Sequence, residues 1–387
     1  MIYLDNAATT SPKPAAVREA VSAALRDYSA NPGRSGHRMS VEAAEAVYAC
    51  RKRAAHFFGA PSEERVIFTP NCTASINYVL KGLLKSGDHV VTSSLEHNAV
   101  MRPLHRMSRQ NGVLYDLAEV IFEDQEATLR SFIRAMRPNT RLVICTHASN
   151  VTGAVLPIAE IGRVCRERGI LFAVDAAQTA GILPIHMGDM CIDYLCVATH
   201  KGLYAPMGTG LLICAADLPG TLIEGGTGTD SISLEQPADL PERLESGTIN
   251  TPGIIGIGAG IDFVEKKGVS RIYAHELRLV TRLYDALEEM SAARLYTGRP
   301  VQGLYAPVLS FNLAGLTSPE TAALLDKAGI ACRAGLHCAP SAHKRIGTLD
   351  QGTVRLCPSA FTRPEEIQRT IEVLRKLDIQ QKKARNY

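Results

Sequence analysis

The sequence contains no tryptophan, and aromatic residues make up only 5% of its 387 residues. Charge of one sign is scarce as well, since 42 basic and 39 acidic residues leave a net charge of +3. A basic patch interleaved with aromatic side chains, which marks many nucleic-acid-binding modules, is therefore missing. We expect no binding to nucleic acid and no electrostatic attraction to a membrane surface.

Long hydrophobic runs are also absent. The most apolar stretch, GIIGIGAGI, is far too short to span a bilayer and is typical of a packed helix. The first residues, MIYLDNAATT, lack a basic region followed by an apolar run, so we expect no export signal. The ten cysteines include no CxxC pair and no regular framework. This spacing indicates free thiols in a reducing cytoplasm and argues against a metal site.

Short apolar runs alternate with amphipathic segments from about residue 65 to about residue 215. The runs are RVIFT, DHVVTS, RLVICTH, ILFAVDAA, DYLCVATH and GTGLLIC, and helix-like segments such as TASINYVLKGLL and IAEIGRVCRERG lie between them. This alternation predicts an α/β fold with a mostly parallel sheet covered by helices. After about residue 265 the pattern changes to that of an α+β region, so we expect a second domain.

Polar side chains follow several of the predicted strands. In open α/β sheets, ligands bind beyond the carboxyl ends of the strands. The side chains at these positions are His97, Asn150, Asp175, Gln178, His200 and Lys201. Each one alone would be interpreted as a solvated residue, a turn former or a helix cap. Together they supply an amine, an acid and a flat ring at one edge of the sheet.

This combination is what pyridoxal 5′-phosphate (PLP) requires of a protein. A lysine forms a Schiff base with the cofactor, an acid keeps the pyridine nitrogen protonated, and a ring stacks on the cofactor face. The cofactor phosphate also needs a binding site, and FTPNCTASIN places a turn and a hydroxyl directly before a helix start. Cys72 and Thr73 would lie there, with Thr73 as hydroxyl donor. The alternative is a simple N-cap by Thr73 or Ser75.

Seven motifs occur in a fixed order along the chain: YLDNAATT, EHNAV, SNVTG, VDAAQ, THKGLYAPMGTG, ESGTINTPGIIG and RAGLHCAP. On these motifs the chain resembles class V aminotransferase-fold enzymes, and more narrowly the group II cysteine desulfurases, which include selenocysteine lyases. The resemblance implies a PLP-dependent transferase of fold type I with a seven-stranded-type sheet. It also implies a large PLP-binding domain over residues 15–262. A small α+β domain would comprise residues 1–14 and 263–387 and carry the Cys338 loop.

The resemblance also implies a role for each matching residue around the cofactor. Lys201 resembles the Schiff-base lysine, Asp175 the partner of the pyridine nitrogen, and His97 the stacking ring. Gln178 resembles the donor to the cofactor's phenolic oxygen, and Asn150 resembles a residue near the cofactor and substrate. Thr73 and His200 resemble phosphate ligands. Thr248 resembles a third phosphate ligand, which comes from the second subunit of a homodimer.

The substrate side of the site follows from the same resemblance. Arg333 and Arg355 resemble arginines near the substrate carboxylate, with Arg355 binding it, and such guanidinium forks suit a bidentate grip on a carboxylate. Cys338 resembles the nucleophile that receives sulfur. Its short polar loop argues against deep burial, and we expect His337 and the arginines to lower the pKa of its thiol. A structural thiol is the alternative for Cys338.

Three positions depart from the family pattern. Ala198 stands where a serine is usual, so one phosphate hydrogen bond is missing or comes from Thr199. Asn71 replaces a glycine in the phosphate turn and tolerates positive φ better than most residues. Leu336 replaces a second histidine near the cysteine. These changes bear on substrate preference and rate more than on cofactor binding.

The sequence thus predicts a PLP-dependent cysteine desulfurase. It would convert L-cysteine to L-alanine, with L-selenocysteine as a second candidate substrate, and pass sulfur from a Cys338 persulfide to an acceptor protein or thiol. Two alternatives stay open at this point. One is a selenocysteine lyase, and the other is a class V aminotransferase or cysteine lyase that forms no persulfide.

Overall fold

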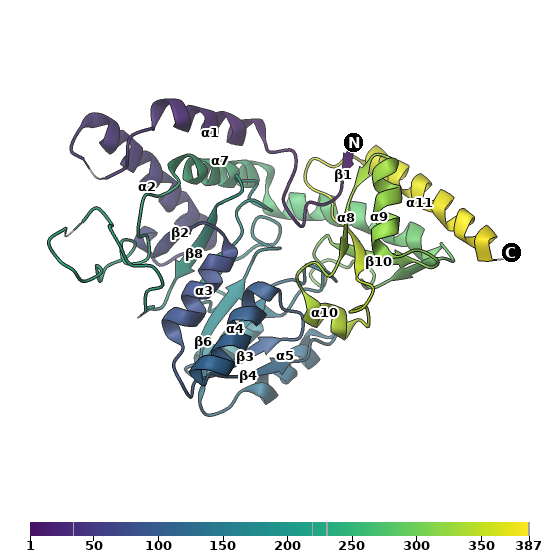
Figure 1. Cartoon of the computed structure of the whole chain (residues 1–387), viewed down its shortest axis with the longest axis horizontal. Coiled ribbons are helices and arrows are strands. Elements are labelled where there is room, and N and C mark those ends of the chain that lie inside the picture. The colour runs from purple at the N-terminus through teal and green to yellow at the C-terminus, as the bar shows by residue number, and fades with distance from the viewer. Residues whose placement is uncertain (34, 219, 230, 386–387) are drawn as a thin grey trace.

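The computed structural model describes residues 1–33, 35–218, 220–229 and 231–385. A larger α/β part holds most of the first 268 residues, and a smaller α+β part lies beside it at the right of Figure 1. No helix in these described residues is long and apolar enough to cross a membrane.

The larger part is built on a seven-stranded sheet in the order β2-β8-β7-β6-β5-β3-β4. Its strands are β2 (Val66–Thr69), β3 (His89–Ser93), β4 (Leu114–Ala118), β5 (Thr140–Thr146), β6 (Leu171–Asp175), β7 (Tyr194–Val197) and β8 (Gly210–Cys214). Every neighbouring pair is parallel except the two pairs that involve β8. The predicted fold class is therefore confirmed, and all six predicted runs form strands.

The seventh strand, β4, was not anticipated. It lies at the edge of the sheet, and its sequence LYDLA leaves Leu114 and Leu117 exposed. An edge strand with one open side carries neither a continuous apolar run nor a regular alternation of apolar and polar residues. Its pairing with β3 is a tertiary feature that the local sequence does not encode.

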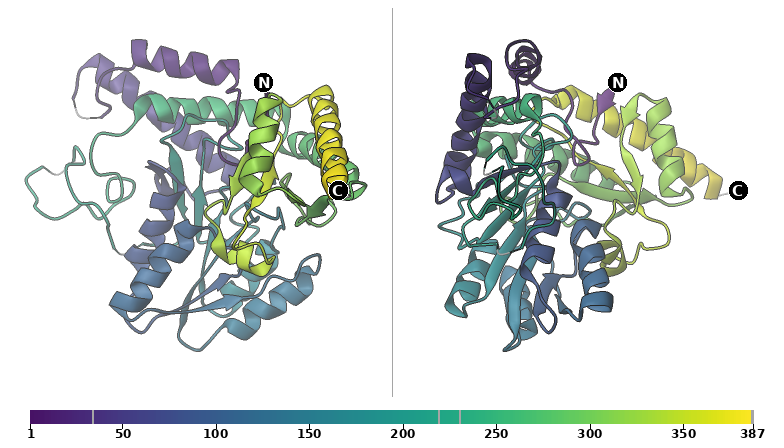
Figure 2. Two further views of the ribbon diagram at one scale, coloured as in Figure 1. Left: turned by 45° about the vertical axis from the view of Figure 1, so that its right-hand side comes forward. Right: turned by 60° about the vertical axis from the view of Figure 1, so that its left-hand side comes forward.

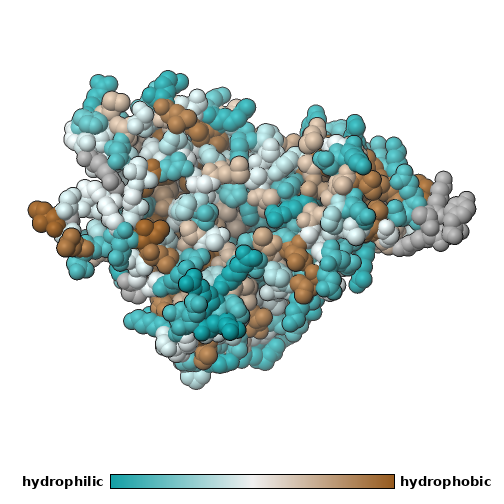
Figure 3. All heavy atoms as spheres, viewed as in Figure 1, coloured by the Kyte–Doolittle hydropathy of each residue, from teal (hydrophilic) through white to brown (hydrophobic). Residues whose placement is uncertain are grey.

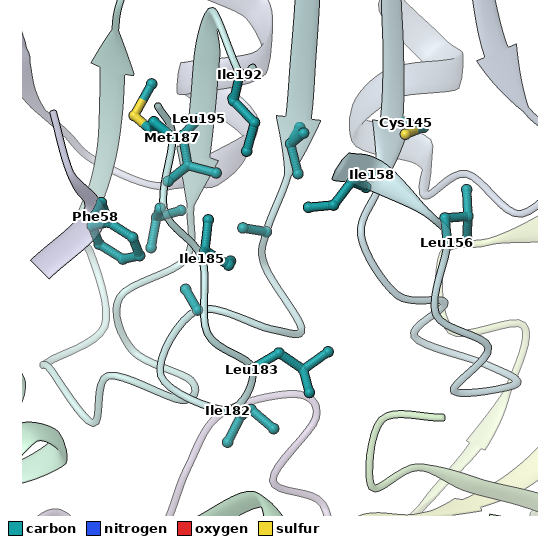
Figure 4. Packing of buried hydrophobic residues seen from close by; sticks show 14 of the residues in the cluster. Phe58, Cys145, Leu156, Ile158, Ile182, Leu183, Ile185, Met187, Ile192 and Leu195 are labelled. Carbon is teal, nitrogen blue, oxygen red and sulfur yellow. The ribbon is translucent and has the colours of Figure 1, made fainter. Parts of the chain in front are cut away.

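Helices cover both faces of this sheet, as period-two side-chain alternation requires. Phe172 and Val174 of β6 join the core under α2, α5, α6 and α7, whereas Ala173 joins the opposite core under α3 and α4. Figure 4 shows part of the first core, in which Phe58 and Leu195 lie among aliphatic side chains. The helices of this part are α1 (Ala15–Asp27), α2 (Arg38–Phe58), α3 (Cys72–Leu83), α4 (Asn98–Asn111), α5 (Gln125–Ala135), α6 (Ile158–Glu167) and α7 (Thr251–Lys267), with a 3₁₀ turn η1 (Glu63–Arg65).

The smaller part contains an antiparallel sheet in the order β12-β13-β10-β9 and a parallel pair of β1 with β11. These strands are β1 (Ile2–Tyr3), β9 (Ala293–Leu295), β10 (Leu309–Leu313), β11 (Ile330–Ala331), β12 (Arg333–Gly335) and β13 (Thr353–Leu356). The helices are α8 (Val269–Glu288), α9 (Ser318–Lys327), α10 (Pro340–Arg345) and α11 (Pro364–Arg385). In both views of Figure 2 the yellow C-terminal helix α11 lies on the side of the molecule that holds both chain termini.

The N-terminal strand belongs to this smaller part although it opens the chain. Ile2 pairs with Ile330, and the N–H of Cys357 donates to the carbonyl of Leu4 at 2.7 Å. Residues 5–14 then cross to the larger part. The exact division of the chain into two domains stays a prediction.

A buried acid joins the ends of β3 and β5. Glu96 is fully buried, and its Oε1 accepts hydrogen bonds from the Ser93 hydroxyl and from the N–H of Thr146 at 2.9 Å. Its Oε2 has no hydrogen-bond partner in the described part of the chain. Burial raises the pKa of the Glu96 carboxyl to about 8, because a charge here would lose its hydration. Glu96 is therefore protonated near neutral pH.

This proton gives the first testable prediction. The Glu96 carboxyl has an ordinary pKa of 4.5 and a folded pKa of about 8. Between these values unfolding releases its proton, so this group's contribution to stability falls as pH rises, by at most about 1.4 kcal/mol per pH unit, and levels off above pH 8. Glu96→Gln keeps a neutral isostere and should remove that decline. Denaturant unfolding between pH 5 and 9 measures it, with the exposed Glu19→Gln as control. Identical pH profiles for wild type and Glu96→Gln would contradict a protonated Glu96.

Candidate functional site

A cavity lies at the carboxyl ends of the parallel strands, where the turns after β2, β3, β5, β6 and β7 meet. The predicted site residues in its wall are Cys72, Thr73, His97, Asn150, Asp175, Gln178, His200 and Lys201. Asn71, Ala99, Thr146, Ala177 and Ala198 complete the wall. His97, Asp175 and Lys201, which together span more than 100 residues of sequence, therefore bring an imidazole ring, a carboxylate and an amine to one cavity.

Lys201 is held by its backbone rather than by its side chain. The Thr10 hydroxyl donates to the Lys201 carbonyl at 3.0 Å, and the Lys13 ammonium donates to the neighbouring carbonyl of His200 at 2.7 Å. The Lys201 amine itself makes no hydrogen bond to the described residues. Burial, followed by the nearby charge of Arg355, lowers its pKa. A larger neutral fraction of this amine favours attack on a carbonyl carbon.

One carboxylate oxygen of Asp175 accepts hydrogen bonds, and the other has no donor in the described chain. Its Oδ1 accepts from the N–H of Ala177 at 2.9 Å and from the Cys72 thiol at 3.5 Å. Burial first, and then the charge of Asp175, raise the pKa of Cys72 well above its ordinary value, so this thiol stays neutral and donates. Within the described chain nothing donates to Oδ2. An aromatic N–H in the cavity could donate to it.

His97 forms the wall between the cavity and a neighbouring surface groove. It is the N-cap of α4, and its Nδ1 accepts from the N–H of Ala99 at 3.0 Å. Burial lowers the pKa of the ring, so it is neutral and carries its proton on Nε2. A neutral flat ring in the wall is suited to stacking on a planar ligand.

The start of α3 differs in detail from the sequence-based expectation. Asn71 is its N-cap and accepts from the N–H of Ala74 at 2.9 Å, so neither Thr73 nor Ser75 caps the helix. The φ of Asn71 is −174°, so the expected use of a left-handed backbone at Asn71 was wrong. The Ser75 hydroxyl instead donates to the carbonyl of Leu211 at 2.9 Å. Thr73, by contrast, keeps its hydroxyl exposed at the cavity wall, next to the N–H groups of the helix start.

Two other predicted phosphate ligands fall in different places. His200 lies in the wall, and burial followed by the charges of Lys201 and Lys13 lowers its pKa to about 4, so the ring is neutral. Thr199 is fully buried and bonded to the Thr209 hydroxyl at 2.6 Å. The Thr209 hydroxyl donates to the carbonyl of Pro206, so in the bond between the two threonines Thr199 is the donor. The Thr199 hydroxyl therefore has no proton left for a phosphate. The structure therefore does not bring Thr199 to the cavity.

The Cys338 loop of the smaller part is docked onto the larger part by its backbone. The Asn150 amide donates to the carbonyl of His337 at 2.7 Å, and the N–H of Asn98 donates to the carbonyl of Cys338 at 2.7 Å. His337 and Cys338 have φ values of +48° and +57°, a left-handed backbone that is uncommon outside glycine. Cys338 is exposed, and it lines the groove that shares His97 and Thr73 with the cavity.

His337 does not carry the charge expected of it. Its Nε2 donates to the carbonyl of Thr353 at 3.0 Å, and its Nδ1 has no partner in the described chain. Burial, followed by the charge of Arg355, lowers the pKa of the ring to about 2. His337 is therefore neutral at physiological pH and places no positive charge beside Cys338.

The two predicted arginines face each other across the small sheet. Arg333 of β12 is paired with Arg355 of β13, so both side chains lie on one face. Arg355 is buried and donates to Asp5 Oδ1 and to the carbonyl of Asn150, both at 3.0 Å. Arg333 is half-buried, and it forms no ion pair with the described residues. Arg355 thus contacts the backbone of Asn150 in the cavity wall, whereas the guanidinium of Arg333 has no carboxylate partner in the described chain.

Several residues of this neighbourhood are not predicted by the sequence pattern, and one predicted residue lies elsewhere. Asp5, Thr10 and Lys13, which hold Arg355 and the Lys201 loop, lie in or just after the YLDNAATT motif, and the polar residues of that motif were the available signal. Glu96 directly precedes His97, and only its burial reveals it. Thr248 is exposed and does not line this chain's cavity.

The residues present fit PLP. An amine without a partner, a carboxylate with an open oxygen, a neutral ring and a helix start with an exposed hydroxyl match its aldehyde, pyridine nitrogen, ring face and phosphate. Lys201, Asp175, His97 and Thr73 would hold these four groups respectively.

Comparison with known proteins agrees with this geometry. Residues 2–370 match the family described as aminotransferase class-V. A probable cysteine desulfurase of Methanothermobacter thermautotrophicus is 35% identical over 97% of this chain and 94% of its own length. A probable cysteine desulfurase of Pyrococcus abyssi is 34% identical with the same coverage.

Solved structures give the same result. The apo structure of a cysteine desulfurase from Thermococcus onnurineus NA1 superposes with a TM-score of 0.89 at 34% identity, covering 97% of this chain and 94% of that one. The cysteine desulfurase CsdA of Escherichia coli, with its S-sulfonic acid, gives 0.86 at 25% identity and the same coverage. The cavity, the order of the strands and these matches together show that the chain belongs to the aminotransferase class-V family.

Proposed function

We propose that this protein is a PLP-dependent cysteine desulfurase that converts L-cysteine to L-alanine and receives the sulfur on Cys338. One observation carries the proposal. The exposed Cys338 is docked at a groove whose wall, formed by His97 and Thr73, is also the wall of the cavity that contains Lys201 and Asp175. The Cys338 thiol, which lies outside the cavity, can therefore reach the sulfur atom of a substrate bound inside the cavity. The names of the relatives support the same activity.

Each residue around the cavity would have a separate role in the reaction. Bound PLP would act as an electron sink for negative charge at the substrate α-carbon. Lys201 would hold the cofactor and move a proton to or from the α-carbon, and Asp175 would keep the pyridine nitrogen protonated. The open fork of Arg333, with Arg355 behind Asn150, would hold the substrate carboxylate.

Cys338 would then take the sulfur. Its thiolate attacks the substrate sulfur, a new S–S bond forms, and the substrate C–S bond breaks with its electron pair on carbon. A proton delivered to that carbon yields alanine, and the sulfur remains on Cys338 as a persulfide. An acceptor protein or thiol removes it afterwards. All ten cysteines are free, and we place the protein in a reducing compartment such as the cytoplasm.

The first test concerns cofactor attachment. Lys201→Ala removes the amine that would bind PLP covalently. The purified variant should lose the yellow colour of lysine-bound PLP, and its alanine formation from L-cysteine should fall to the background level. Absorption spectra and amino-acid analysis measure both outcomes, with Lys13→Arg as a control that keeps a donor to the His200 carbonyl. A Lys201→Ala protein that keeps both colour and turnover would disprove the cofactor assignment.

The second test concerns sulfur transfer. Cys338→Ser preserves the loop but replaces the thiol with a hydroxyl, which forms no reactive anion near neutral pH. Alanine formation from L-cysteine should fall by at least about a hundredfold while substrate binding still changes the cofactor spectrum. The exposed position of Cys338 makes it open to labelling, so mass spectrometry should find one added sulfur on its peptide in the wild type.

The products decide among the alternatives. Pyruvate and ammonia from L-cysteine would indicate a cysteine lyase, and a requirement for a keto acid would indicate an aminotransferase. If Cys338→Ser turns over L-selenocysteine at the wild-type rate but loses turnover of L-cysteine, the protein is a selenocysteine lyase. Sulfide release from L-cysteine at the wild-type rate by Cys338→Ser would make Cys338 a bystander.

We also propose that the enzyme is a homodimer with shared sites. The described residues 220–229 and 231–247 form a segment that extends away from the body of the chain (Figure 1, left). In this segment Ile232 and Leu234 are 97% and 103% exposed, and such apolar side chains favour a protein contact. Thr248 follows this segment, and the family resemblance makes it a ligand of the phosphate bound by the other subunit.

A mutation at Leu234 tests the proposed dimer contact. Leu234→Asp places a charge in the proposed contact and should shift the protein toward monomers and lower its activity roughly tenfold or more, because each site would lose Thr248. Light scattering and alanine formation are the measurements. Leu114→Asp on the edge strand β4 is the matched control. A fully active wild-type monomer at assay concentration would rule out the shared site.

A further inference from the structure

A groove of about 340 Å³ opens at Cys338 and runs outward between α3 and α4. The polar side chains that line it recur every four residues along each helix, so each helix presents one polar stripe to the groove. They are Thr73, Asn77 and Lys81 from α3, and Asn98, Arg102 and Arg106 from α4, where Ala99 and Pro103 also line the groove. Because Thr73 and Asn98 lie at the cavity end, the two helices run outward in the same direction from Cys338.

The part of the groove away from Cys338 is positively charged. Neither α3 nor α4 contains an acidic residue. Lys81, Arg102 and Arg106 are exposed, and no carboxylate of the described chain pairs with any of them. The Arg106 guanidinium donates to the amide oxygen of the neutral Gln110 at 2.9 Å. Figure 3 shows the resulting strongly hydrophilic surface over these helices. Both helix N-termini, which carry partial positive charge, point toward the Cys338 end.

Some exposed arginines on other helices pair with acids, as Arg130 does with Glu126 and Arg375 with Glu289, whereas Arg102 and Arg106 have no acidic partner among the described residues. The desulfuration chemistry does not use the groove charges either, because the carboxylate and phosphate of the proposed ligands fall to other residues. A second hollow continues the first one past Lys81 and Arg106. The positive surface therefore extends away from the catalytic cavity.

We propose that this groove binds an acidic segment of the sulfur-acceptor protein and brings its thiolate to Cys338. The proposal rests on the desulfurase function proposed above. From Thr73 to Lys81 the groove spans eight helical residues, which is about 12 Å at 1.5 Å per residue. An extended segment of about four residues covers that length. A cysteine at one end of such a segment would meet Cys338 while its acidic neighbours pair with Lys81, Arg102 and Arg106.

The transfer step needs no oxidant. The acceptor thiolate attacks the outer sulfur of the Cys338 persulfide and forms a new S–S bond. The bond between that outer sulfur and the Cys338 sulfur breaks, and Cys338 leaves as a thiolate. The acceptor becomes a persulfide, and the charges balance. Positive groove side chains would favour the thiolate form of the acceptor by lowering the pKa of its thiol.

The experiment uses the PLP-loaded enzyme after exposure to L-cysteine and two short blocked peptides. Each peptide holds one cysteine, flanked by glutamates in one and by glutamines in the other. At low salt the second-order rate of sulfur transfer, followed by mass spectrometry, should be about tenfold higher for the glutamate peptide, and salt should remove the difference. Arg102→Glu should abolish the preference, and Arg102→Lys should keep it. Arg109→Glu, on the same helix but outside the groove lining, should also keep it.

Alanine formation supported by dithiothreitol, an uncharged dithiol, separates the two proposals. It should be the same in wild type, Arg102→Glu and Arg109→Glu. A wild type that forms persulfide normally but transfers it equally to both peptides would overturn the groove proposal alone, as would equal losses in Arg102→Glu and Arg109→Glu. Failure of the wild type to form any persulfide would overturn both proposals. Stronger competition by a single-stranded oligonucleotide than by the glutamate peptide would make the groove a nucleic-acid site and overturn the acceptor proposal.

Discussion

The buried guanidinium of Arg355 joins three parts of the chain that are distant in sequence. It lies on β13 of the small sheet, pairs with Asp5 of the N-terminal segment and donates to Asn150 of the larger part. A buried charge is costly unless it is paired and hydrogen-bonded, so removal of either partner would be strongly unfavourable. The relative position of the two parts, and with it the distance from the cavity to the Cys338 loop, depends on this arginine.

The N-terminal segment has a second role at the opposite wall. Its hydroxyls and the Lys13 ammonium hold the turn that carries His200 and Lys201, while Gln178 donates to the carbonyl of Ala7 at 3.1 Å. The Lys201 side chain is thereby left free of hydrogen bonds to the described chain although its backbone is firmly fixed. A reactive amine with a rigid backbone and an uncommitted end is preorganised for covalent attachment.

The sequence could predict what depends on local pattern and strand order. The apolar runs located six of the seven sheet strands, and the residues after them located Lys201, Asp175, His97 and their neighbours in one cavity. What failed depends on contacts between distant segments. The pairing of Arg355 with Asp5, the neutral state of His337 and the commitment of Thr199 to Thr209 all arise from burial that no local pattern encodes. The edge strand β4 was missed for the same reason.

The left-handed backbone at His337 and Cys338 has an energetic consequence. For residues with a side chain this conformation costs roughly 1–2 kcal/mol each, while the two hydrogen bonds that dock the loop contribute about 1 kcal/mol apiece. The two hydrogen bonds that dock the loop therefore offset much of the backbone cost at His337 and Cys338. The exposed Cys338 thiol is held at the groove by these backbone contacts rather than by its own side chain.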